Sequence, residues 1–186
     1  MKRFGIKYAA LMLAALVLLA GCIPVENVEK AWKDAKADEG LVGLWVQNGG
    51  DGKVGFVNTD QGFLVTSGTS GLEGGCKSIT TNGHNYVIVA EFRAAILGFE
   101  NVDDNNKSGT LMRYKVDGDN LTLYTYNQDK INEAVKAKKV PGEMDENDSA
   151  SLNELDEATI KWLGEIGDEK EGWDVQKYKR KRGAVG

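Results

Sequence analysis

The sequence predicts a mainly β fold, an antiparallel up-and-down barrel or strongly curved sheet of about eight strands with helices at its periphery. Residues 41–126 consist of short runs rich in β-branched and aromatic residues. Clusters of Gly, Asn and Asp separate the runs, and these residues tolerate the backbone angles of tight turns. Near residues 112–123 the apolar positions alternate on both sides of a turn, which is typical of a hairpin with one buried face. A barrel also leaves no sheet edge exposed.

Each run is assigned to one predicted strand. In chain order the strands cover residues 41–47, 53–58, 61–67, 76–81, 84–92, 94–100, 108–116 and 121–126, and residues 173–180 are expected to return as a last strand. The turn signals between them lie at 48–52, 60, 82–83, 103–106 and 117–120. Strands this short and this closely spaced favour a sandwich or a barrel over a parallel α/β sheet.

Helical spacing of apolar residues predicts three helices, at residues 26–37, 128–139 and 152–166. Asn127 is a suitable N-cap for the second helix. Ser151 and Glu154 have the spacing of a capping box, which places the start of the third helix at residue 152. This helix lies in segment 143–171, which holds 11 acids and 2 bases. We interpret the acidic segment as a solvated surface.

The N-terminus has the pattern of a secretory leader. Lys2, Arg3 and Lys7 precede residues 9–20, an uncharged run of 12 residues. A run of this length is too short to span a bilayer as a helix and suits the apolar part of a signal peptide. It ends in the tetrapeptide Leu-Ala-Gly-Cys, with the cysteine at position 22.

This ending resembles the lipobox of bacterial lipoproteins, in which Leu and two small residues precede Cys. The resemblance implies cleavage before Cys22, a diacylglycerol on its sulfur and a further acyl chain, such as palmitate, on the new amino group. Two or three acyl chains hold a protein on a membrane, whereas one chain binds only marginally. Ile23 follows, where enteric bacteria read Asp as an inner-membrane retention signal, so the resemblance implies the cell envelope, with the outer membrane favoured. The alternative is an ordinary signal peptide with an incidental cysteine.

The chain therefore divides into a leader at 1–21, a tether with a short helix at 22–40 and a β-barrel-like domain at 41–182 that contains a helical segment at 127–167. Loss of the leader removes three bases and changes the net charge from −5 to −8, which argues against a nucleic-acid partner. No cofactor other than covalent lipid and no metal site is expected, because His84 is the single histidine. Cys76 is expected to be buried, with an intermolecular bridge or a reactive thiol as alternatives.

Gly43 and Trp45 open the first predicted strand. A Gly-x-Trp at this position is similar to the pattern of the lipocalin (calycin) family, and residues 41–126 are similar to the domains of small bacterial lipoproteins with lipocalin-like folds. The resemblance implies that the Trp45 ring closes one end of the barrel, beneath an arginine of the last strand, Arg180 or Arg182. Three aromatic residues are candidates for lining a ligand cavity, Trp45, Tyr124 and Tyr126. Ordinary packing is the alternative for each.

These patterns predict a membrane-anchored, non-catalytic binding module for a small apolar ligand or lipid. The alternative is a structural protein that contacts another envelope protein or a wall polymer. Its contact surface would be the acidic helices or a basic tail formed by Lys177, Lys179, Arg180, Lys181 and Arg182. We do not expect an enzyme, because no histidine-based or other catalytic set stands out. A carboxylate-based hydrolase is the third hypothesis.

Overall fold

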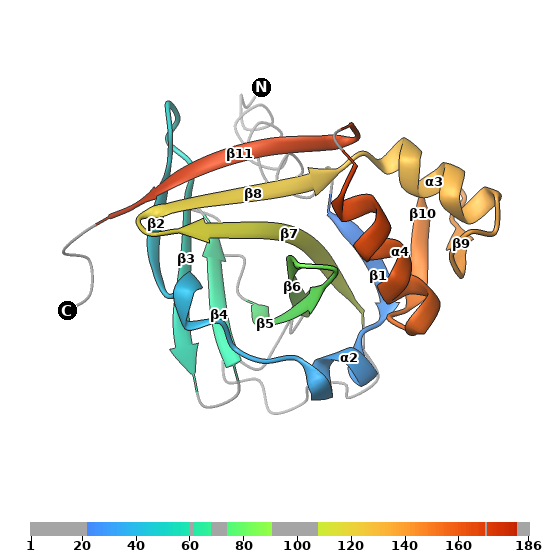
Figure 1. Ribbon diagram of the computed structural model, residues 1–186, viewed down its shortest axis with the longest axis horizontal. Helices are drawn as coiled ribbons and strands as arrows, with labels where there is room; N and C mark the ends of the chain where they lie inside the picture. The colour runs from blue at the N-terminus through green and yellow to red at the C-terminus, as the bar shows by residue number, and fades with distance from the viewer. Residues whose placement is uncertain (1–21, 60–61, 68–73, 91–107, 170, 182–186) are drawn as a thin grey trace, which may run out of the picture.

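The computed structural model describes residues 22–59, 62–67, 74–90, 108–169 and 171–181 (Figure 1). The strands are β1 (Ile23–Asn27), β2 (Gly43–Gln47), β3 (Lys53–Thr59), β4 (Gly62–Ser67), β5 (Gly74–Thr81), β6 (His84–Ala90), β7 (Gly109–Asp117), β8 (Asn120–Tyr126), β9 (Gly142–Met144), β10 (Ala150–Glu154) and β11 (Trp173–Arg180). The helices are α2 (Glu29–Asp34), α3 (Gln128–Lys136) and α4 (Glu157–Gly167), with a 3₁₀ turn η1 (Glu39–Leu41) before β2. The predicted mainly β fold is confirmed.

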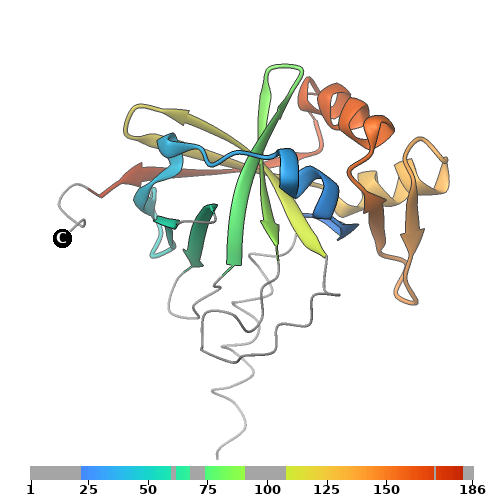
Figure 2. The same ribbon diagram turned by 90° about the horizontal axis from the view of Figure 1, so that it is seen from below.

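The strands of the described residues form one mixed sheet in the order β6-β5-β4-β3-β2-β11-β8-β7-β1-β10-β9. Strand β6 pairs with β7 as well as with β5. The eight strands from β6 to β7 in this order are therefore connected in a ring of antiparallel pairs. Strand β1 pairs with the first residues of β7, and β10 lies parallel to β1. Helices α3 and α4 lie on the same side of the molecule as β9 and β10 (Figure 2). The strongly curved sheet with peripheral helices is thus as predicted.

The curvature gives the sheet an inner and an outer face, each with its own apolar core. On the inner face Trp45, Phe56 and Leu121 are completely or almost completely buried. On the outer face Tyr86 and Leu111 pack against the elements that cover the sheet there, including β1, β10, α3 and α4. Because successive side chains of a strand alternate between faces, the same strands contribute to both cores.

The prediction of a tether at residues 22–40 is wrong. Residues 23–27 are the strand β1, which pairs with β7 at Ile23–Leu111 and with β10 at Val25–Leu152. The side chains of Ile23 and Val25 are each 1% exposed. Burial of these two side chains between β7 and the helices makes the segment part of the domain, which therefore begins at residue 23 and not at residue 41. The short helix of this region is α2, which is shorter than predicted.

The predicted start of the third helix is also wrong. Residues 150–154 form β10, which pairs with β1 and β9, and Leu152 is fully buried in the outer core. The helix begins instead after Asp156, whose carboxylate accepts the backbone N–H of Thr159 at 2.7 Å. The capping box at Ser151 is therefore not formed. The alternation of buried and half-buried residues from Ala150 onward is that of a strand.

The remaining predicted elements differ from the structure mainly at their ends. Helix α3 and its N-cap at Asn127 are as predicted, with the helix ending three residues earlier. The strand predicted at 94–100 lies outside the described residues. No helix in the described ranges has both the length and the apolar character needed to cross a membrane.

Candidate functional site

Trp45 and Arg180 close one end of the inner face. The fully buried Trp45 indole donates its Nε1–H to the Leu41 carbonyl oxygen at 2.7 Å. The Arg180 guanidinium lies over the indole ring, with Cζ 4.4 Å from the ring centroid. Its two terminal nitrogens donate to the carbonyl oxygens of Val42 at 2.8 Å and Gly40 at 2.9 Å. The arginine thus joins the last strand, β11, to the segment that precedes β2.

A glycine next to this arginine is favoured by its backbone angle. Gly43 has φ of +132°, which disfavours other residues, whereas a Cβ there would make only an ordinary contact with Arg180 Nη1 at 3.7 Å. The arginine over Trp45 is Arg180, and Arg182 lies outside the described residues. The contact that the Gly-x-Trp resemblance implies is therefore present in the structure.

The inner face beyond Trp45 is largely apolar. Val87 and Cys76 are fully buried, whereas their cross-strand partners Met112 and Val89 are only partly buried against the same core. Burial raises the pKa of the Cys76 thiol to about 12. Cys76 is thus buried as predicted, and a thiol that stays protonated near neutral pH is a poor nucleophile.

The segment between α2 and β2 crosses the sheet (Figure 2). It borders a cleft of about 620 Å³. Lys36 pairs through its backbone with Ser78 of β5, which fixes the segment on the strand. At the base of the cleft the Tyr114 hydroxyl donates to Asp38 Oδ2 at 2.6 Å and also bonds Ser78 Oγ at 3.0 Å. Burial, with a further contribution from Asp38, raises the pKa of Tyr114. The hydroxyl is therefore a fixed donor and not an acid–base group near neutral pH.

Tyr124 and Tyr126 lie on the outer face of β8, opposite the inner-facing Leu121 and Leu123. Tyr126 is buried and packs on the rings of Trp162 and Trp173. The guanidinium of Arg113 lies over the Tyr124 ring, with Arg113 Cζ 4.6 Å from the ring centroid. Of the three aromatic candidates, the structure therefore places only Trp45 on the inner face.

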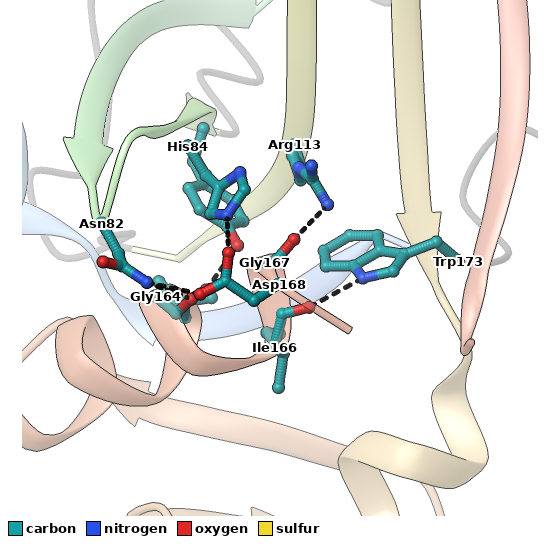
Figure 3. Close-up of polar contacts among 10 residues, drawn as sticks. Asn82, His84, Arg113, Gly164, Ile166, Gly167, Asp168 and Trp173 are labelled. Atoms are coloured by element: carbon teal, nitrogen blue, oxygen red, sulfur yellow. Dashed lines mark hydrogen bonds and ion pairs between the residues drawn. The ribbon is translucent and has the colours of Figure 1, made fainter. Parts of the chain in front are cut away.

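The single histidine lies in a polar cluster at the end of α4 (Figure 3). His84 Nε2 is 2.9 Å from Asp168 Oδ1, and Asn82 Nδ2 donates to Asp168 Oδ2 at 2.7 Å. Asn82 also donates to the Gly164 carbonyl oxygen at 3.3 Å. The turn between β5 and β6 is thereby fixed to the helix.

Three further side chains of the sheet donate to carbonyl oxygens of the same helix end. Arg113 donates to Gly167, Trp173 to Ile166 and Tyr86 to Leu163, at 2.6, 2.9 and 2.6 Å (Figure 3). The last four carbonyls of a helix have no donors within the helix, so Arg113 and Trp173 supply donors there, and Tyr86 adds a bond at Leu163, about one turn earlier. The cluster around His84 is thus a docking site for α4. Sequence reasoning missed it because its members are far apart in the chain.

Cys22, the predicted lipidation site, is 5% exposed and directly precedes β1. Burial raises the pKa of its thiol to about 11. Among the described residues, no three His, Cys, Asp or Glu side chains gather closely enough to hold a metal ion.

In comparisons with known proteins, no family model matches the chain, and no curated protein and no solved structure matches it.

Three of the four tyrosines that are buried in the described residues make the fold especially sensitive to alkali. Desolvation by burial raises the pKa of Tyr86, Tyr114 and Tyr126. Nearby carboxylates raise the pKa of Tyr114 and Tyr126 further, whereas the Arg113 charge partly opposes the increase at Tyr86. An unfolded tyrosine titrates near pH 10, so unfolding releases protons above that value. The stability from neutral tyrosines is fully present below about pH 10 and is lost as the pH rises further. We expect the free energy of unfolding, measured by urea titration, to fall as the pH rises above about 10. In the variant Tyr114→Phe, the free energy of unfolding is expected to fall less steeply with pH. Tyrosinate absorbance from all three residues at pH 10 in a folded protein would contradict this.

Proposed function

We propose that the protein is a membrane-anchored envelope lipoprotein, favouring the outer membrane, whose curved sheet binds a small apolar ligand or lipid without catalysis. The observation that carries the proposal is the apolar inner face, which Trp45 and Arg180 close at one end. Val89 and Met112 of this face are only partly buried in the described residues. Pockets for small molecules are lined mostly by apolar side chains, as this face is.

The lipobox-like sequence ending at Cys22 supports the anchor. Two or three acyl chains do not fit where the buried Cys22 side chain lies, because protein cores have few spaces larger than a water molecule. Acylation therefore requires Cys22 to move out from its position beside β1. Because β1 begins at the next residue, Ile23, this movement involves the end of the strand and leaves its pairing with β7 at Val25 possible.

Native mass spectrometry of the full chain, extracted from host membranes in a mild detergent, tests both parts of the proposal. We expect a mature chain that begins at Cys22 and carries the mass of diacylglycerol and a further acyl chain. We also expect a second, noncovalent mass that is released on denaturation. An unmodified Cys22 or cleavage elsewhere would contradict the anchor, and the repeated absence of a noncovalent ligand would contradict the binding function.

Matched variants separate the two parts. Cys22→Ser is expected to leave the protein unprocessed and without lipid, whereas Cys76→Ser keeps the lipid. Met112→Trp fills space on the inner face and is expected to abolish the noncovalent mass. Val175→Trp places the same ring on the outer face, where Val175 is 50% exposed, and is expected to retain the ligand.

A further inference from the structure

Two lysines flank a threonine on the outer face of three neighbouring strands. Lys115 of β7 pairs with Thr122 of β8, and Thr122 pairs with Lys177 of β11. The three strands lie side by side in Figure 1. All three side chains point outward, since Tyr114 and Leu121, which precede Lys115 and Thr122, belong to the inner core. Strand spacing places the two lysine Cα atoms roughly 10 Å apart, so their long side chains can reach a common ligand above Thr122.

The same residues line a cleft of about 320 Å³. Its further lining includes the amide side chains of Asn48 and Asn120 and the half-buried ring of Tyr124. One carboxylate, Asp117, also lines it, but Asp117 belongs to the next cross-strand row, which carries Lys179 at its other end. The cleft therefore offers ammonium, hydroxyl and amide donors above the sheet.

The lysines have no evident structural task. Both are exposed, and neither forms an ion pair within the described ranges. Lysines often protect the edge strands of sheets from pairing with other chains. That explanation does not apply here, because β7, β8 and β11 are each paired on both sides. Two cations in one cleft repel each other, and a bound anion would relieve this repulsion.

We propose that the cleft formed by Lys115, Thr122 and Lys177 binds a phosphate group, carried either by a free anion or by a lipid headgroup. Lysine binds phosphate as a point charge, and hydrogen bonds in which a partner is charged are about twice as strong as neutral ones. The hydroxyl of Thr122 and the amide of Asn48 supply neutral donors beside the two charges. This site lies on the outer face, separate from the apolar inner face, and does not depend on the proposed function.

Titrations of the full chain in an uncharged detergent test the site and its ligand. One arm adds inorganic phosphate, and the other adds phosphatidylglycerol to the micelles; binding is followed by calorimetry and by amide NMR shifts at Thr122. We expect saturable binding in at least one arm. Saturation with inorganic phosphate alone identifies a free anion, and saturation with phosphatidylglycerol alone identifies a headgroup. Absence of saturable binding in both arms would overturn the proposal.

Variants distinguish a specific site from general attraction. The double variant Lys115→Gln/Lys177→Gln is expected to weaken binding about tenfold or more, and Thr122→Val to weaken it less. The matched control, Lys138→Gln/Lys139→Gln, removes the same charge from two exposed lysines that follow α3 and is expected to bind as the wild type does. Equal weakening by the two double variants would refute a site at Lys115 and Lys177.

Discussion

Replacing Trp45 with alanine is expected to lower the free energy of unfolding by about 3–5 kcal/mol, as for other large buried side chains. The substitution leaves a cavity in the inner core and leaves the Leu41 carbonyl oxygen without its donor. It also removes the ring on which the Arg180 guanidinium lies. Urea unfolding of the full chain in an uncharged detergent measures the loss. Trp45→Phe retains most of the apolar volume and is expected to cost less.

A double-mutant cycle with Arg180→Lys separates the arginine contact from the cavity. Lysine keeps the charge but cannot reproduce the paired bonds to Gly40 and Val42. If Arg180 stabilises the protein through its contact with the ring, the double variant Trp45→Ala/Arg180→Lys loses less free energy of unfolding than the sum of the losses in the two single variants. Strict additivity would show that the contact between Arg180 and Trp45 contributes nothing to stability.

Gly167→Ala is expected to destabilise the protein by about 1–3 kcal/mol, the usual cost of overpacking. Helix α4 approaches the turn between β5 and β6 so closely that a Cβ at Gly167 would overlap the His84 ring. The ring would have to move, and its bond to Asp168 would be lost with it. Thermal and urea unfolding measure the effect.

His84→Ala provides the control for this close approach. Removing the ring clears the space that the new methyl group needs, so the double variant Gly167→Ala/His84→Ala is expected to be no less stable than His84→Ala alone. An equal penalty for Gly167→Ala with and without the ring would contradict the steric explanation.

Local patterns in the sequence were sufficient for the elements that they specify directly. The hairpin of β7 and β8 follows from alternating apolar residues around the Asp-Gly-Asp-Asn turn at 117–120, and α3 follows from its cap at Asn127. The position of Trp45 at the start of β2 followed from its Gly-x-Trp pattern, and the structure pairs it with Arg180.

Elements that depend on distant partners could not be predicted in this way. Strand β1 contains Pro24 and has few residues, and only its pairing with β7 and β10 makes it a strand. In β10, Leu152 and the nearby Leu155 also fit a helical spacing, so local pattern alone favoured a longer α4. The lysine cleft was missed because Lys115 and Lys177 are far apart in the sequence. They become neighbours only because each pairs with Thr122 of β8.

The place of β11 determines when the fold can be completed. This strand lies between β2 and β8, so β2 gains its second neighbour only from the last described residues of the chain. Pairings between segments so distant in sequence have a high contact order and form slowly. Until they form, a newly made chain leaves one edge each of β2 and β8 open to wrong partners, and aggregation is most favoured in this interval.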